Sequence, residues 1–258
     1  MIKAIFFDID GTLVSFRTHA MSEETVSCLE RLKEKGIKTF IASGRTILTM
    51  DNLSGFQFDG YVTMNGALVM VSGKVISRTP IDRTTAEKIA ETADRERIPC
   101  VANREDVIAI NMTNEETERA FRMIRMPEIP VISAVEMVRE PVYQFTLFAD
   151  SMKEKELFLP IAENLEPSRW NPAFMDFNPK GLTKADGIGA VIRHLGITRE
   201  ETMAFGDGGN DIDMLRYAGI GVAMGNAEGH VKQAADHVTA TVDEDGIGKA
   251  LRHFGILQ

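Results

Sequence analysis

The stretch AIFFDIDGTLV, residues 4–14, decides the fold class. Its first four residues are apolar or small, which is typical of a buried strand, and the run then ends in Asp8 and Asp10, followed by Gly11 and Thr12. Carboxylates favour water over a protein interior, so a buried strand that ends in two of them gains no stability from their position. The arrangement therefore points to a chemical task at the end of this strand.

The residues that follow predict a βαβ unit. SEETVSCLERLKEKG, residues 22–36, has apolar residues at helical spacing, acids near its start and Gly36 just past its end. KTFIAS, residues 38–43, follows as a second apolar strand. A helix that connects two neighbouring strands implies that the strands are parallel, with functional groups gathered at their carboxyl ends.

The same alternation returns near the end of the chain. YVTMN (61–65) reads as a third strand, and ALVMV (67–71) and KVISR (74–78) resemble a hairpin around Ser72-Gly73. The later segments predict, in order, helix, strand, helix, strand, helix and helix: TKADGIGAVIRHLG (183–196), TMAFGD (202–207), NDIDMLRYAG (210–219), GIGVAMG (219–225), HVKQAAD (230–236) and DGIGKALRHFG (245–255). The predicted class is α/β, with a Rossmann-like parallel sheet.

The middle of the chain differs in kind and predicts an inserted α+β domain. It offers a helix over 84–95, strands around VIAINM (107–112) and VYQFTLFA (142–149), and helices near EETERAFRMIR (115–125) and MKEKELFLPIA (152–162). Pro80 and the NPKG segment at 178–181 suit the crossing points. We therefore expect a core domain built from residues 1–81 and 179–258, with residues 82–178 inserted.

Composition narrows the possible partners. The 258 residues carry a formal net charge of −9, which disfavours nonspecific attraction to nucleic acid or to an anionic membrane. The first residues lack the features of a secretory signal, and the uncharged stretches are too short to span a bilayer, so we expect a cytoplasmic protein. Cys28 and Cys100 show no paired spacing and are expected to be reduced thiols, with Cys28 in the core.

Four acids follow strands whose ends should share one edge of the sheet. Asp8 and Asp10 follow the first strand, and Asp207 and Asp211 lie in FGDGGNDIDML. Two carboxylates about 4 Å apart repel by about 4 kcal/mol at an effective dielectric constant near 20. Such a cluster needs a cation, and oxygen-only ligands favour a hard ion such as Mg²⁺, the ion normally used beside phosphate groups.

Two further features suit a phosphate. Ser43-Gly44 lies where a strand turns toward a helix, so a hydroxyl and free backbone N–H groups can receive phosphate oxygens. Lys184, near the start of a predicted helix, can bring a positive charge to the same edge. Considered by itself, this residue is equally well interpreted as a solvated lysine on the surface.

These segments together resemble a known family. FDIDGTL, Ser43 of IASGR, Lys184 of KGLTKADGI, and GDGGNDIDML occur in the order of the four motifs of the haloacid dehalogenase superfamily. The MNGA loop and the large insert resemble its Cof-type branch of sugar phosphatases with an α/β cap, and the whole chain is similar to bacterial hexose phosphate phosphatases of that branch. The motifs are specific for fold and reaction class and much less so for the substrate.

The resemblance implies a role for each motif residue. Asp8 is the expected nucleophile, which forms an aspartyl phosphate, and Asp10 is expected to protonate the leaving sugar oxygen and later to take a proton from water. Mg²⁺ is expected on Asp8, Asp207 and the backbone carbonyl of Asp10. The expected phosphoryl-binding residues are Ser43, Gly44, Lys184 and Asn210. Asp211 is expected to support metal-bound water or Lys184.

The insert is expected to act as a cap that excludes water during transfer and selects the leaving group. Trp170, with Arg169 and Asn171 beside it, can face a sugar, but a tryptophan is more often a packing residue of its own domain. Arg45 directly follows Ser43-Gly44 and can contact the substrate or form a structural ion pair. The expected partner is a small phosphate monoester, and the expected state is a monomer or weak homodimer.

Two other readings stay open. Phosphomutases of the phosphomannomutase type also begin with DxDGT and pass the phosphoryl group to another sugar hydroxyl rather than to water. A signalling receiver is phosphorylated on an aspartate without a need for turnover. The second acid, Asp10, and the insert of about a hundred residues speak against a receiver, because such a protein gains little from a closing lid.

Overall fold

The computed structural model describes residues 1–258, apart from the side chain of Trp170. The chain forms two compact units. Unit 1 combines Met1–Arg78 with Thr183–Gln258, and unit 2 is the continuous segment Thr79–Leu182. These limits lie within a few residues of the boundaries placed from the sequence at 82 and 178, and the role of unit 2 as a cap stays a prediction.

Unit 1 is built on one eight-stranded sheet, with the strand order β13-β12-β11-β1-β2-β3-β4-β5. Its strands are β1 (Ala4–Phe7), β2 (Lys38–Ala42), β3 (Gly60–Thr63), β4 (Leu68–Val71), β5 (Lys74–Arg78), β11 (Thr202–Gly206), β12 (Ile220–Ala223) and β13 (His237–Val238). The strands from β13 to β3 are parallel, and β4 and β5 add an antiparallel hairpin. The predicted α/β class is confirmed.

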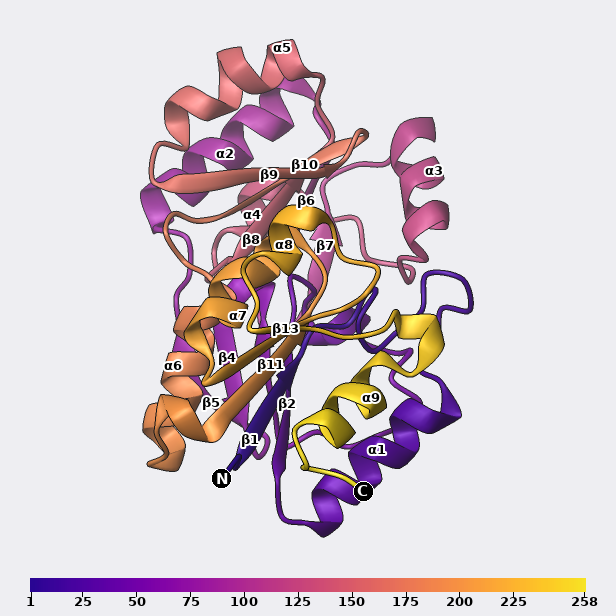
Figure 1. Ribbon diagram of the computed structural model, residues 1–258. Helices are drawn as coiled ribbons and strands as arrows, with labels where there is room; N and C mark the ends of the chain where they lie inside the picture. The colour runs from indigo at the N-terminus through magenta and orange to yellow at the C-terminus, as the bar shows by residue number, and fades with distance from the viewer. The chain divides into compact units, whose positions relative to one another are not determined.

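The helices of unit 1 cover both faces of this sheet (Figure 1). They are α1 (Glu23–Glu34), α6 (Lys184–Leu195), α7 (Ile212–Tyr217), α8 (Gly229–Lys232) and α9 (Gly246–His253). Short 3₁₀ turns occupy Ile47–Thr49, Met64–Gly66, Arg199–Glu201, Gly209–Asp211 and Val242–Glu244. Because α8 has only four residues, the helix predicted over 230–236 is shorter than expected.

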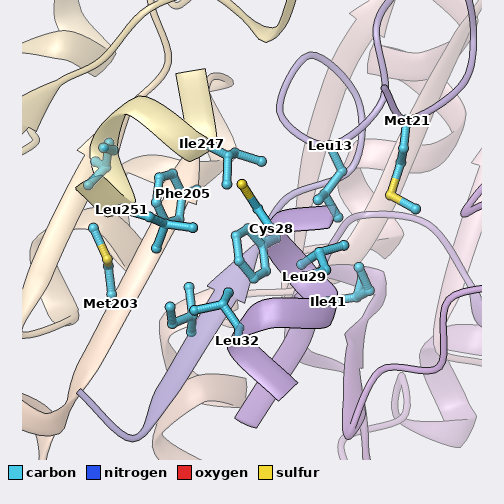
Figure 2. Close-up of a cluster of buried hydrophobic side chains, with 14 of the residues drawn as sticks. Leu13, Met21, Cys28, Leu29, Leu32, Ile41, Met203, Phe205, Ile247 and Leu251 are labelled. Atoms are coloured by element: carbon cyan, nitrogen blue, oxygen red, sulfur yellow. The ribbon is translucent and has the colours of Figure 1, made fainter. Parts of the chain in front are cut away.

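Alternation along β1 separates two apolar layers. Ile5 and Phe7 pack in the cluster that contains α1 and α9, whereas Ala4 and Phe6 pack in the cluster that contains α6 and α7. Successive side chains of a strand point to opposite faces, so a central strand between two helical layers must be apolar on both. Figure 2 shows the first cluster, with Cys28 of α1 among its members. The predicted core position of Cys28 is confirmed, because its side chain is buried.

Helix α1 begins and ends where its sequence signals predict. The hydroxyl of Ser22 accepts a hydrogen bond from the backbone N–H of Thr25, which satisfies one of the free donors of the first turn. Glu23 and Glu24 lie in that turn, where acids interact favourably with the helix dipole. Gly36, just past the helix, has a φ of 73°, a conformation that glycine adopts without steric cost.

Unit 2 contains a five-stranded antiparallel sheet with the order β7-β6-β8-β10-β9. Its strands are β6 (Cys100–Asn103), β7 (Ile108–Ile110), β8 (Gln144–Leu147), β9 (Leu165–Asn171) and β10 (Phe174–Pro179). Its helical segments are α2 (Arg83–Glu96), α3 (Glu115–Ile124), α4 (Ala134–Met137), α5 (Ser151–Lys153), a π-helical turn (Glu154–Phe158) and a 3₁₀ turn (Leu159–Ile161). Apolar side chains of α2 and α4 pack in one cluster of this unit, and those of α3 in another.

Unit 2 departs from the sequence analysis in two respects. Strands β6, β9 and β10 were not predicted, and the helix expected over 152–162 is a succession of α, π and 3₁₀ turns. Pro160 lies in the last of these turns, and proline has no backbone N–H to continue an α-helix. Within the described part of the chain, no helix combines the length and apolar character needed to cross a bilayer.

Candidate active site

The expected functional residues gather where three neighbouring strands of unit 1 end. Asp8 follows β1, Ser43 follows β2 and Asp207 follows β11. Strand β1 lies between β2 and β11, so the chain order reverses at this point of the sheet. Open α/β sheets bind their ligands at such a reversal, beyond the carboxyl ends of the strands.

Lys184 is the centre of a buried ion network. Its Nζ atom lies 2.6 Å from Oδ1 of Asp8 and 2.6 Å from Oδ1 of Asp211. The side chains of Lys184 and Asp211 are 0% exposed. A lysine is almost never fully buried unless it is paired. The surface reading of Lys184 is therefore excluded, and this residue does reach the same edge as Asp8.

Asp211 uses both of its carboxylate oxygens within the protein. Oδ1 accepts from Lys184, while Oδ2 accepts the backbone N–H groups of Asp207 and Gly208, each at 2.8 Å. These contacts fix the loop that carries Asp207 and hold Lys184 in place. They suit the supporting role that was expected of Asp211.

The charges of this site shift its proton equilibria. Burial raises the pKa of Asp8 to about 8, and the neighbouring Asp211 acts in the same direction, while Lys184 opposes both. Burial and Asp211 likewise raise the pKa of Asp207 to about 6. Burial on its own would lower the pKa of Lys184, but Asp211 and Asp8 outweigh it and raise this pKa. The lysine is therefore charged, and the site holds more negative charge than one lysine balances.

Asp207 is oriented by two side chains from other parts of unit 1. Oδ1 accepts from the hydroxyl of Thr12 at 3.1 Å, and Oδ2 accepts from Nδ2 of Asn226 at 3.0 Å. Asn226 also donates to the carbonyl of Gly11 at 2.9 Å and accepts the N–H of Val242 at 3.0 Å. The sequence analysis missed Asn226, which lies in the loop that follows β12.

Replacing Asn226 with alanine is expected to weaken divalent metal binding by about 10-fold or more, because Asp207 loses the donor that fixes its carboxylate. Metal affinity is measured by calorimetric titration of the metal-free protein. Asn114→Ala is the matched control, since it removes an asparagine that caps α3 in unit 2 and should lower stability by about 1 kcal/mol without affecting the metal. Equal metal affinity in wild type and Asn226→Ala would contradict this role.

Asp10 and Arg45 form a two-point ion pair. Nε of Arg45 donates to Oδ2 of Asp10 at 2.8 Å, and Nη2 donates to Oδ1. The remaining nitrogen, Nη1, donates to the carbonyl of Thr49 and to Oδ1 of Asn52. The structure thus places Arg45 on Asp10, which is the ion-pair alternative, and contact of Arg45 with a substrate stays a prediction.

The expected phosphate-binding groups lie around Gly44. The backbone N–H of Arg45 donates to the hydroxyl of Ser43, a buried side chain. Nδ2 of Asn210 lies 3.7 Å from the position that a Cβ atom of Gly44 would occupy, and the amide of Asn65 lies at 3.4–3.5 Å from it. Asn65, which was not among the predicted site residues, accepts a hydrogen bond from Asn210.

The other sequence candidates belong to unit 2. The guanidinium of Arg169 is bound to Glu154, a buried acid, and to the carbonyls of Asn171 and Pro172. Oδ1 of Asn171 accepts the backbone N–H of Ala173. Both side chains thus make contacts within their own unit. The side chain of Trp170 lies outside the described residues, so its predicted contact with a sugar stays a prediction.

The donor set suits a hard divalent cation. Oxygen atoms of Asp8, Asp207 and Asp211 lie within 4.8 Å of one another. Asp211 accepts three hydrogen bonds, whereas Asp207 accepts two from side chains and Asp8 one, so Asp8 and Asp207 keep more capacity to bind an ion. The negative charge of this aspartate cluster exceeds the single positive charge of Lys184. A cation bound here would therefore be stabilised by the remaining negative charge.

This fold and site define a class of enzymes with a mostly parallel sheet and a cluster of aspartates beyond the carboxyl ends of its strands. Residues 5–251 match the family model of haloacid dehalogenase-like hydrolases, and the chain belongs to this family. YkrA of Bacillus subtilis, which carries a provisional phosphatase name, is 33% identical over 99% of both chains. The 5-amino-6-(5-phospho-D-ribitylamino)uracil phosphatase YcsE of the same organism is 30% identical over 98% of this chain and 96% of its own.

Solved structures agree with this family. The subclass IIB sugar phosphatase BT4131 is 47% identical and has a TM-score of 0.88, over 99% of this chain and 100% of its own. BT1666 of Bacteroides thetaiotaomicron, a phosphatase of the same superfamily, is 36% identical with a TM-score of 0.88, over 100% of this chain and 96% of its own. The chain is therefore a phosphoric monoester hydrolase of the Cof-like branch, and its substrate is a small phosphate ester.

Proposed function

We propose that this enzyme hydrolyses sugar phosphates, with hexose phosphates as the favoured substrates, and that it depends on Mg²⁺. The observation that carries the proposal is the buried contact of Lys184 with Asp8, because it holds a cation against the carboxylate that must approach a phosphorus atom. The 47% identity with a sugar phosphatase supports the substrate class.

Mg²⁺ is the proposed ion because its ligands in proteins are oxygens and it commonly accompanies phosphate groups. Asp8, Asp207 and the backbone carbonyl of Asp10 are the proposed ligands. When bound, the ion offsets negative charge on the reacting groups and favours the ionised form of Asp8. Mg²⁺ therefore complements Lys184, which alone does not balance the acids of the site.

The proposed reaction has two steps on this chain's own residues. An oxygen of Asp8 attacks phosphorus, the bond from phosphorus to the sugar oxygen breaks, and Asp10 gives that oxygen its proton. Asp10 then takes a proton from water, whose oxygen attacks phosphorus and frees both phosphate and the carboxylate of Asp8. Ser43, Gly44, Asn210 and Lys184 hold the phosphoryl oxygens, and unit 2 acts as the cap that excludes water.

A panel of phosphate esters tests the proposal. With Mg²⁺ we expect phosphate release from glucose 6-phosphate and related hexose phosphates without any bisphosphate activator, and we expect release to stop in EDTA and return when Mg²⁺ is added in excess. The panel should include nucleotides, pyridoxal phosphate and 5-amino-6-(5-phospho-D-ribitylamino)uracil, the compound in the name of YcsE. Preferred hydrolysis of that last ester would reject the hexose class but keep the phosphatase mechanism.

Two outcomes would replace the proposal by an alternative. Conversion of a sugar phosphate into its isomer without free phosphate would indicate a phosphomutase. A stable phosphoprotein with negligible turnover would indicate a phospho-accepting signalling protein.

A further inference from the structure

The turn that joins β3 to β4 has an unusual backbone. Three consecutive residues, Met64, Asn65 and Gly66, have φ values of 48°, 55° and 105°. Left-handed conformations are unfavourable for most residues with a Cβ atom, such as Met64, whereas asparagine adopts them more readily. Backbone strain of this kind persists where the surrounding structure enforces it, and it often occurs at binding sites.

The surroundings of this turn are the segments that carry phosphate-binding residues. The backbone N–H of Met64 donates to the carbonyl of Arg45, and that of Asn65 donates to the carbonyl of Ser43, both at 3.0 Å. On its other side, a Cβ atom on Gly66 would lie 2.5 Å from the carbonyl oxygen of Thr183, the residue before Lys184. The turn is therefore held between Ser43 and the start of α6.

The strained backbone presents the amide of Asn65 to the space above Gly44. Oδ1 of Asn65 accepts from Nδ2 of Asn210 at 3.1 Å. The Cβ position of Gly44 lies 3.4 Å from Oδ1 and 3.5 Å from Nδ2 of Asn65. Among the hydrogen bonds of the described residues, Nδ2 of Asn65 donates none, so its two N–H groups are available to a ligand.

We propose that Asn65 is a phosphoryl-binding residue, whose Nδ2 donates a hydrogen bond to a phosphate oxygen beside Ser43 and Gly44. A neutral donor suits this position because Asp8, Asp207 and the proposed Mg²⁺ already bring full charges to the site. The inference rests on the proposed function, to which it adds one binding group. It also accounts for the unusual turn, because the contacts with Ser43 and Thr183 hold the backbone in the conformation that presents the amide of Asn65.

Asn65→Asp is the sharpest test, because it retains an oxygen that can accept from Asn210 but lacks the donor and adds a negative charge. We expect the dissociation constants of orthovanadate and inorganic phosphate, measured with Mg²⁺ present, to rise at least 10-fold, with a parallel loss of kcat/KM. Asn65→Gly lacks the amide but adopts a positive φ freely, so it should also lose anion affinity while its Tm is equal to or higher than that of the wild type.

Ser72→Gly is the matched control. Ser72 has a φ of 50° in the β4–β5 turn of the same unit, so glycine should raise Tm there with unchanged affinity for both anions. If folded Asn65→Asp and Asn65→Gly bind both anions as wild type does, Asn65 is only structural and the inference is overturned. If wild type itself binds neither anion with Mg²⁺ present, the proposed function fails, and this inference fails with it.

Discussion

Lys184→Met is expected to lower the free energy of unfolding by about 3–5 kcal/mol and to remove phosphatase activity. Lys184 is fully buried between Asp8 and Asp211, so methionine fills a similar volume but leaves two buried carboxylates without a cation. The loss of stability should be greater at pH 8 than at pH 5, because Asp8 is protonated at pH 5, whereas at pH 8 it is partly ionised and loses the stabilising pairing with Lys184. Urea denaturation at both pH values, in EDTA, measures the effect.

Two further variants show whether charge is the cause. Lys249→Met, at an exposed lysine of α9, should change stability by less than about 0.5 kcal/mol. Lys184→Met combined with Asp8→Asn should recover about 1–3 kcal/mol relative to the sum of the single changes, because one of the uncompensated charges is gone. Additive effects of the two substitutions would show that the buried charges do not interact as described.

Asp8→Asn is expected to lower kcat by about 10⁴–10⁶-fold, because the amide cannot attack phosphorus. The same substitution should stabilise the metal-free protein at pH 8 by about 1–2 kcal/mol, since it replaces an unfavourable buried charge by a neutral group of the same shape. Lys184 remains paired with Asp211 in this variant. Phosphate release and chemical denaturation in EDTA measure the two effects, which have opposite signs.

The pH dependence follows from the raised pKa of Asp8. The folded protein binds this proton with a pKa of about 8 and the unfolded chain with one near 3.8, so the stabilising contribution is complete below pH 3.8 and is lost as pH rises to about 8. Asp207, with a pKa of about 6, acts in the same way over the lower part of this range. Metal-free wild type should thus lose stability between pH 6 and 8 and Asp8→Asn should not. A flat wild-type curve over that interval would contradict the pKa of Asp8.

The core elements could be predicted because their sequences carry strong local signals. Residues 4–7 and 40–42 are apolar on both strand faces, and residues 22–36 combine helical spacing with a Ser22 cap and Gly36. The meeting of Asp8, Lys184, Asp207 and Asp211 followed from one topological rule, that parallel strands end at the same edge. The confirmed hairpin of β4 and β5 likewise had a turn pair, Ser72-Gly73, between two apolar runs.

Unit 2 carried weaker signals. Strand β6, CVAN, is short and buried at every position, so it shows no alternation. Strand β9, LEPSRWN, is mostly polar and contains Pro167, which is tolerated because β9 lies at an edge of its sheet. Their pairing with β8 and β10 depends on contacts between residues far apart in sequence, and no local pattern encodes such contacts.

The missed site residues, Asn65 and Asn226, are neutral amides in loops. Asn65 lies in the MNGA loop noted for the family resemblance, but the sequence assigned a role to neither amide, because what they bind depends on how the backbone turns. One available signal is position, because both follow strands of the parallel part of the sheet, as Ser43 does. The ion pair between Arg45 and Asp10 could not be decided from the sequence either, because a sequence does not fix the direction of a long side chain.

The discontinuity of unit 1 has a consequence for biosynthesis. Strand β1 pairs on one side with β2 and on the other with β11, where Ala4 lies opposite Thr202. A ribosome therefore completes all of Thr79–Leu182 while β1 still lacks one neighbour, and we expect that continuous segment to fold first in the nascent chain. Asp8 is translated well before Lys184 and Asp207, so we expect catalytic competence to arise only after the segment that carries Asp207 has been synthesised.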